Sequence, residues 1–485
     1  LLPSAGDGVI WDSRRVDSQP MLVGSFIPYL WIGSDDAGLC WFADSDQGWE
    51  PSPAAPAIAI ERDASGTRLV LNLISAPTTL AVPRTLSFAV QATPVKPIHR
   101  GWRMDSWWTG DTFRDYAQVE TKGGHLIFTS LPFPLDVAKS KAMADERHAN
   151  TNAHIFGFAK YRENVVPYFE HIALGDGFVP EAAYFAEEWR TTTSRGFDYG
   201  GPFADFMVHH VAAWARDGGI DGFYLDNVHP IADDNISAGR GWLLPDGRVQ
   251  PTYRMFATRR YMLRLRAALH ENGKRDKFVI HMTNNMIIPW IGAADIALDG
   301  ELNVIYPEHG KDFIDCWSTM RLRGCVPSQW GVAVNFLQEH QGDWQREALI
   351  KAMRAYTGLV LAHDILASAN ANGLNPEAWI AREAFGMAED DVRFVGYWQP
   401  GAVAATPTTV LASAWLRPGA ALIVAVNTGG AAEVELDLRA LGLDARFARD
   451  AETKAALPVL DGRVRATIAR HDYRHILVTA QEAAP

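Results

Sequence analysis

The stretch "GIDGFYLDNVHP" (Gly219–Pro230) decides the fold of the central region. Its apolar centre predicts a buried strand, yet the strand ends on Asp226, Asn227 and His229. In a barrel of parallel strands, side chains at the carboxyl ends of the strands line the mouth of the active site. The stretch therefore predicts both a barrel strand and a polar site at its end.

Residues 98–391 repeat the same strand-then-helix pattern. The helical segment 251–273 shows apolar residues at helical spacing and a stop at Gly273. Eight interleaved strands predict a (β/α)₈ TIM-type barrel. A doubly wound open sheet is the alternative, but no G-x-G-x-x-G follows a strand. The candidate strands are "HRGWRM", "HLIFTS", "AHIFGFA", "IDGFYLD", "KFVIHMT", "ADIALDG", "SQWGVAVNF" and "GLVLAHDI".

Both flanks alternate short apolar runs with turns, which predicts β structure. Residues 1–97 contain "AIAIERDASGTRLVLNLI" (57–74), a predicted hairpin, and "PVKP" (94–97), a predicted hinge. Residues 392–485 return to short alternating runs. The sequence thus predicts an α/β protein with a TIM-type barrel at 98–391, flanked by β-sandwich domains at 1–97 and 392–485. We expect the first of these to be truncated.

Composition limits the classes of partner. The net charge of −12 argues against nucleic acid or an anionic membrane, and no apolar run reaches the ~18 residues that span a bilayer. The 17 tryptophans favour a carbohydrate partner, because aromatic faces stack on sugar rings, although they also fill large cores. Three cysteines form neither a metal spacing nor a disulfide framework, and we expect no cofactor.

The sequence leaves the compartment and the assembly open. The small number of cysteines favours a reducing compartment, or a bacterial protein that uses few of them. Because the chain begins at Leu1 rather than at methionine, we expect its true N-terminus to be absent, with or without a signal peptide. A homo-oligomer is compatible with the sequence, which does not determine the oligomeric state.

Polar, titratable residues recur at the predicted carboxyl ends of four strands. A single residue of this kind is as readily a helix cap or a satisfied core group, but four coincident ends favour a site. Tryptophans in or beside other predicted strands are candidates for stacking on a sugar: Trp102, Trp107 and Trp330. The candidates at the four strand ends are Asp226 and Asn227, His281 and Asn284, Asp299 and Glu301, and His363 and Asp364.

Two carboxylates from different strands predict glycoside hydrolysis. Asp226 is the expected nucleophile or charge stabiliser, and Glu301 the general acid/base. Asp299 is expected to share the strand face of Glu301 and to raise its pKa through like charge, unless "DGE" is a simple turn. Strands separated by one neighbour allow a close carboxyl pair, which predicts retention of the anomeric configuration.

Two other functions stay open from the residues alone. The first is a metal-dependent hydrolase built from His281, His363 and Asp364 together with Asp226, although no H-E-x-x-H motif is present. The second is a non-catalytic carbohydrate-binding barrel. Paired acids at Asp226 and Glu301 count against the second, because binding alone needs no proton donor.

The blocks "PYLWIGSDDAGLCWFADSDQGW" (28–49), "GIDGFYLDN", "ALDGE" and "LAHD" resemble bacterial glycoside-hydrolase-like proteins related to the family 123 glycoside hydrolases. The resemblance implies a β-sandwich, a catalytic barrel and a C-terminal β domain. It also implies an adjacent Asp-Glu pair for catalysis assisted by a substrate acetamido group. This chain has Asp226-Asn227 at that position, so we expect a two-carboxylate mechanism with Glu301 instead.

The block "GLCWFADSDQGW" (38–49) supports two interpretations. Trp41, Phe42 and Trp49 are expected to fill a core where the first domain docks on the barrel. Alternatively, Asp44, Asp46 or Trp49 reaches across to a sugar.

Overall fold

The structure is a computed structural model that describes most of the chain outside residues 109–201. The described residues are 6–15, 26–52, 55–108, 125–130, 137–150, 154–160, 178–179, 196–197, 200, 202–226, 228, 230, 232, 236, 241–275, 278–282, 286–300 and 304–481.

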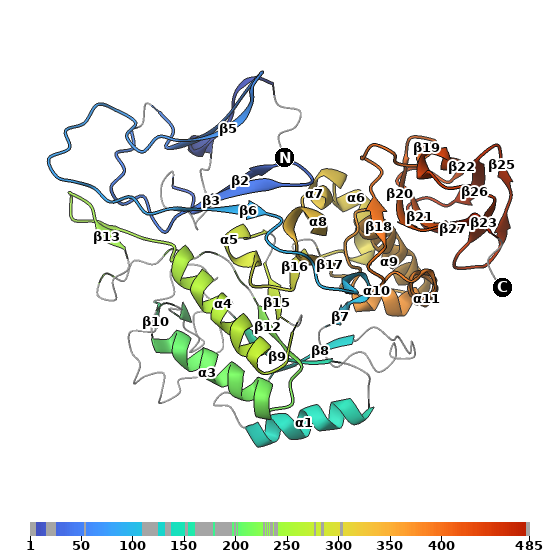
Figure 1. The fold of residues 1–485 in the computed structure, drawn as a ribbon, viewed down its shortest axis with the longest axis horizontal. Coiled ribbons are helices and arrows are strands. Elements are labelled where there is room, and N and C mark those ends of the chain that lie inside the picture. The colour runs from blue at the N-terminus through green and yellow to red at the C-terminus, as the bar shows by residue number, and fades with distance from the viewer. Residues whose placement is uncertain are drawn as a thin grey trace.

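The centre of the molecule is a sheet of seven parallel strands that follow one another in chain order (Figure 1). Each strand pairs with the next along the chain. Six of the predicted strands are confirmed. The strands are β7 (Ser106–Trp108), β8 (His125–Ser130), β9 (His154–Lys160), β12 (Gly222–Asp226), β15 (Phe278–His281), β16 (Ile296–Gly300) and β17 (Ala333–Leu337).

The alternation of side chains along each strand separates two apolar clusters. Phe223, Phe278 and Ala297 point to the face covered by helices and belong to the main core. Tyr224 and Val279 point to the opposite, inner face, where they join a smaller cluster. Since both faces are apolar, the strands carry near-continuous apolar runs, as parallel sheets require. The smaller cluster comprises Trp102, Tyr224, Val279, Ile296, Leu298, Ala333 and Leu366.

From β8 onward, helices lie between successive strands of the central sheet. The predicted helix after β12 is confirmed as α4, and Gly273 follows it with a positive φ of 77°. No helix in the described parts of the chain is long and apolar enough to cross a membrane. The helices are α1 (Val137–Asn150), α3 (Pro202–Asp217), α4 (Met255–Glu271), α5 (Ile288–Ile291), α6 (Phe313–Cys316), α7 (Thr319–Arg323), α8 (Pro327–Trp330), α9 (Arg346–Leu361), α10 (Ala369–Leu374) and α11 (Pro376–Phe385).

Two predicted strands are wrong. "GLVLAHDI" begins inside α9, and its last residues form a turn instead of a strand end. "HRGWRM" ends in a 3₁₀ helix, η2 (Trp102–Met104), and β7 follows it. Every residue of "GLVLAHDI" is buried, so its apolar pattern does not distinguish a strand from a helix.

The eighth position of the predicted barrel is a single bridge. Leu366 pairs in parallel with Asn335 of β17, and the following helix α10 lies against β7. Within the described residues, no ladder joins this segment to β7, so the sheet has the strand order of a barrel without a closed ring of pairing.

The N-terminal region forms two small sheets, one of which contacts α5 (Figure 1). Trp41, Phe42 and Trp49 are buried in the main core, which confirms their predicted packing role. Asp44 accepts a hydrogen bond from the backbone N–H of Phe256, so it caps α4 from another region of the chain. The sheets are β1 (Gly8–Asp12), β4 (Ile58–Asp63) and β5 (Gly66–Leu71), and β2 (Tyr29–Gly33), β3 (Gly38–Phe42) and β6 (Ala89–Thr93).

The C-terminal region forms two antiparallel sheets around a separate apolar cluster. One sheet contributes Ile423 and Ile476 to this cluster, and the other contributes Leu436 and Val464. The first sheet is β18 (Arg393–Val395), β20 (Val410–Arg417), β21 (Ala420–Asn427), β27 (Tyr473–Thr479), β23 (Phe447–Asp450) and β24 (Ala456–Leu457). The second is β19 (Ala404–Thr406), β22 (Ala432–Asp437), β26 (Arg463–Ile468) and β25 (Val459–Leu460).

Candidate functional site

Asp226, Tyr224 and His281 form a hydrogen-bonded group at the carboxyl ends of β12 and β15, here called the Asp226 triangle. The Nδ1 atom of His281 lies 2.7 Å from Oδ1 of Asp226, and the Tyr224 hydroxyl donates to the same oxygen at 2.9 Å. That hydroxyl also lies 3.1 Å from Nδ1 of His281. Because an ionised carboxylate only accepts hydrogen bonds, Nδ1 carries the imidazole proton next to ionised Asp226.

The three side chains differ in exposure. Asp226 is 14% exposed, whereas Tyr224 and His281 are each 2% exposed. The carboxylate is therefore the member of the triangle that an incoming molecule meets first. The tyrosine and the histidine lie behind it and fix its orientation.

The register of the sheet extends this group into a row on the inner face. The position after the Leu225–Ile280 pair holds Asp226 and His281, His281 pairs with Leu298, and Leu298 pairs with Asn335. Asn335 is fully buried, and neither polar atom of its side chain has a hydrogen-bond partner in the part of the chain that the structure describes. A buried amide of this kind is costly unless a water or a polar ligand group satisfies it.

Several predicted site residues lie outside the described residues. They are Asn227, Asn284 and the expected acid/base Glu301. Trp107 lies within β7, and only its backbone is described. The predicted pairing of Asp226 with Glu301 therefore stays a prediction.

Asp299 lies on the opposite face of β16 from the Asp226 triangle. It is fully buried and forms an ion pair with Arg321 at 2.7 Å, with the thiol of Cys325 at 3.4 Å. Since Leu298 points to the inner face, its neighbour Asp299 points to the helices. Placing Asp299 in the site was therefore wrong.

His363 and Asp364 also lie away from the triangle, because they follow a helix and precede the eighth strand position. Asp364 accepts two hydrogen bonds from Arg103, each 2.8 Å long, and one from the indole N–H of Trp415 at 2.7 Å. The cavity beside these groups has a volume of about 10 Å³, which holds at most one water. These two residues therefore lie not in the site but at a junction between the central region and the C-terminal sheets.

This placement also contradicts the predicted metal site. His281 lies at the carboxyl end of β15, whereas His363 and Asp364 lie on the amino-terminal side of Leu366 and have partners of their own. These three residues do not converge on one ion.

The two remaining tryptophan candidates are also packing residues. Trp102 is 8% exposed, precedes the first strand, and carries the guanidinium of Arg103 over its ring at 4.7 Å. Trp330 precedes β17, is 4% exposed, and packs against Trp31 of the N-terminal region with ring centroids 4.9 Å apart. Trp102 belongs to the inner-face cluster that also contains Tyr224, whereas Trp330 belongs to the main core.

Because His363 is buried, we expect the stability of the protein to depend on pH. It is fully buried between the carbonyl of Leu359 and the hydroxyl of Tyr397, and burial lowers its pKa from about 6.5 to about 4. The unfolded chain binds the proton first as the pH falls, so this stabilisation is present above pH 6.5 and is lost towards pH 4. From pH 7 to pH 5 the loss is about 2 kcal/mol.

Urea unfolding at pH 7 and pH 5 checks this expectation. Between pH 7 and pH 5, the free energy of unfolding of His363→Gln should fall by about 2 kcal/mol less than that of the unchanged protein. Equal pH dependence in His363→Gln and in the unchanged protein would contradict the expectation.

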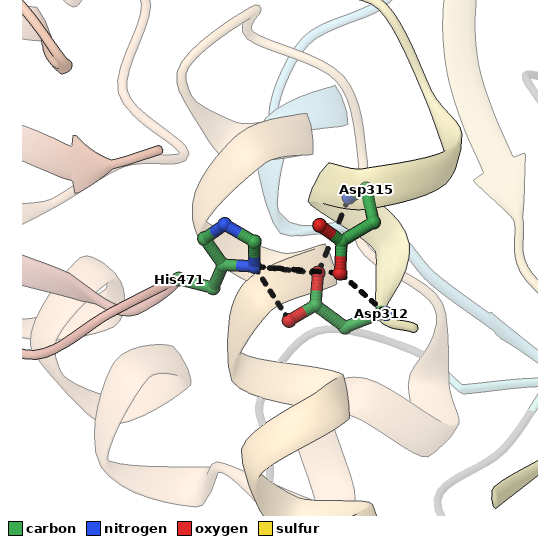
Figure 2. A group of neighbouring side chains, drawn as sticks. All are labelled: Asp312, Asp315 and His471. Atoms are coloured by element: carbon green, nitrogen blue, oxygen red, sulfur yellow. Dashed lines mark hydrogen bonds and ion pairs between the residues drawn. The ribbon is translucent and has the colours of Figure 1, made fainter. Parts of the chain in front are cut away.

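One cluster outside the sheet has the composition of a metal site. Asp312, Asp315 and His471 place their ligand atoms within 4.8 Å of one another (Figure 2). Each group already has protein partners: Asp312 caps α6, Asp315 accepts from the backbone N–H of Asp312, and His471 contacts Asp312 at 2.7 Å. The cluster therefore connects α6 to the C-terminal region without a need for an ion.

Sequence reasoning missed Tyr224 and Asn335. Tyr224 stands two residues before Asp226 in "GFYLD", so strand alternation alone places both on one face. Asn335 is the polar residue within "AVNFL", and a polar group in an otherwise apolar buried strand is a comparable signal.

Solved structures with a similar fold include glycoside hydrolases. An α-amylase from Anoxybacillus matches with a TM-score of 0.52 and 9% identity, over 80% of this chain and 100% of that chain. An α-amylase from Geobacillus thermoleovorans, solved with acarbose, matches with a TM-score of 0.52 and 9% identity over the same shares. No protein-family model matches the chain, and no curated protein matches its sequence. The chain thus has a glycoside-hydrolase-like fold.

Proposed function

We propose that the protein is a glycoside hydrolase that acts on an oligosaccharide or another glycoside, with Asp226 as nucleophile or charge stabiliser. One observation carries the proposal. A carboxylate stands at the carboxyl end of a central parallel strand, accessible in part, with two buried donors on one of its oxygens. This edge of a parallel α/β sheet is where active sites form. The fold shared with known glycosidases supports the same reaction class.

The reaction needs a second carboxyl group, and we assign this role to Glu301, which follows β16. In the first step, a carboxylate oxygen of Asp226 attacks the anomeric carbon while Glu301 protonates the departing oxygen. In the second step, Glu301 removes a proton from water, the water oxygen bonds to the anomeric carbon, and the ester bond to Asp226 breaks. The product keeps the configuration of the substrate. The finer resemblance, to the family 123 glycoside hydrolases, stays a prediction.

A panel of nitrophenyl glycosides covering common sugars and both anomers tests the function. We expect turnover of at least one member, followed by proton NMR of the first product formed, which should be the same anomer as the substrate. Initial appearance of the opposite anomer would make Asp226 a general base and contradict the ester. Saturable binding of an oligosaccharide with no turnover of any panel member would instead favour a non-catalytic carbohydrate-binding barrel.

A further inference from the structure

The Asp226 triangle contains two residues that a substrate does not reach. Tyr224 and His281 are each 2% exposed, and both contact the same oxygen of Asp226. They therefore act on the reaction through Asp226. Their effect depends on how the charge of this carboxylate changes during the reaction.

We propose that Tyr224 and His281 are positioning residues that favour the departure of Asp226 from the glycosyl ester. This inference rests on the proposed function, in which Asp226 forms that ester. It goes beyond it by assigning the two donors to one of the two chemical steps.

The reason is the charge on Oδ1 of Asp226. Hydrogen bonds to an ionised oxygen are roughly twice as strong as those to a neutral one. Asp226 carries a full charge in the free enzyme and none in the ester, where one oxygen is bonded to the anomeric carbon. The donors thus stabilise the free enzyme more than the ester, and their hydrogen bonds strengthen as the ester bond breaks.

The two donors reach Asp226 from different strands. Nδ1 of His281, at 2.7 Å, approaches Asp226 from the neighbouring strand β15, and the hydroxyl of Tyr224, at 2.9 Å, comes from β12 itself. The hydroxyl also lies 3.1 Å from Nδ1, so the three groups restrain one another. The backbone N–H of Val228 donates to the carbonyl of His281, which fixes the two strand ends relative to each other.

Tyr224→Phe removes one donor and keeps the ring. On a substrate with a good leaving group, release of the ester limits turnover, and we expect kcat to fall about tenfold. KM should fall by a similar factor because the ester accumulates, so kcat/KM, which reports the first step, should change less than about threefold. Rapid mixing should show a burst of released nitrophenol close to one equivalent per enzyme.

Two further variants make the result interpretable. His281→Phe removes the other donor and should give the same split between kcat and KM, provided its thermal unfolding shows that it is folded. Tyr261→Phe removes the hydroxyl of a buried tyrosine on α4, outside the site, and should behave as the unchanged protein.

The outcomes separate this inference from the proposed function. A fall in kcat/KM as large as the fall in kcat would mean that the donors serve the first step or only hold the structure, and would overturn the inference. Unchanged kcat and KM in Tyr224→Phe, with Asp226→Asn inactive, would also overturn it while leaving the function intact. Full activity of Asp226→Asn would instead refute the nucleophile, and the inference with it.

Discussion

Asp226→Asn is expected to lower turnover of a nitrophenyl glycoside on the order of a hundredfold or more, without unfolding the protein. Asparagine keeps the shape of the side chain and still accepts a hydrogen bond, but it lacks the charge that attacks or stabilises the anomeric carbon. Steady-state kinetics measures the loss, and thermal unfolding checks that the protein is intact.

Asp221→Asn is the matched control. Asp221 precedes the same strand at its opposite, amino-terminal end, where it pairs with the partly exposed His148 at 2.8 Å. The same chemical change there should leave kcat within about twofold, since surface pairs contribute little. Equal losses in both variants would mean that negative charge near either end of β12, and not chemistry at Asp226, controls activity. Near-normal turnover in Asp226→Asn would refute the proposed role.

Asp364→Asn is expected to lower the free energy of unfolding by about 3 kcal/mol, because it leaves the guanidinium of Arg103 buried without its counter-charge. The Asp364 side chain is 5% exposed, and that of Arg103 is 17% exposed. The backbone at Asp364 has a φ of 59°, a left-handed conformation that asparagine adopts about as readily as aspartate. The substitution therefore tests the charge and not the backbone.

Urea unfolding at neutral pH measures this effect. Asp390→Asn is the control, because Asp390 pairs with Arg100 at 2.9 Å on the exposed side of the same junction. Its stability should be nearly unchanged. A loss in Asp364→Asn no larger than that in the control would show that the Arg103 pair does not stabilise the junction.

The sequence by itself determined where six of the seven strands of the central sheet lie along the chain. Apolar runs such as "HLIFTS", "IDGFYLD" and "ADIALDG" are long enough for strands and too short for helices, and polar residues bound them. The helix after β12 was equally determined, because its apolar residues recur at helical spacing up to Gly273. Six strands, the hairpin of β4 and β5, and the strand-end position of Asp226 follow from such local patterns.

Local sequence patterns could not determine whether the segment "GLVLAHDI" forms a helix or a strand. All residues from Ala355 to Leu366 are buried, so the run has no polar face that would reveal whether its period is that of a helix or of a strand. Contacts of α9 with α6, α10 and the C-terminal sheet decide that it is helical. Because the run begins inside α9, His363 and Asp364 follow a helix and lie at a junction, not at the end of a strand.

The site was determined in part by sequence and in part by tertiary contacts. Periodicity places Asp226 and His281 at strand ends, and alternation places Tyr224 beside Asp226. That β12 pairs with β15, so that His281 meets Asp226 at 2.7 Å, is a property of the assembled sheet. The role of Asp299, in contrast, was not predictable from the sequence. Its partner Arg321 lies on α7 in the outer layer of helices, and only the packing of that layer shows that this carboxylate has a structural role.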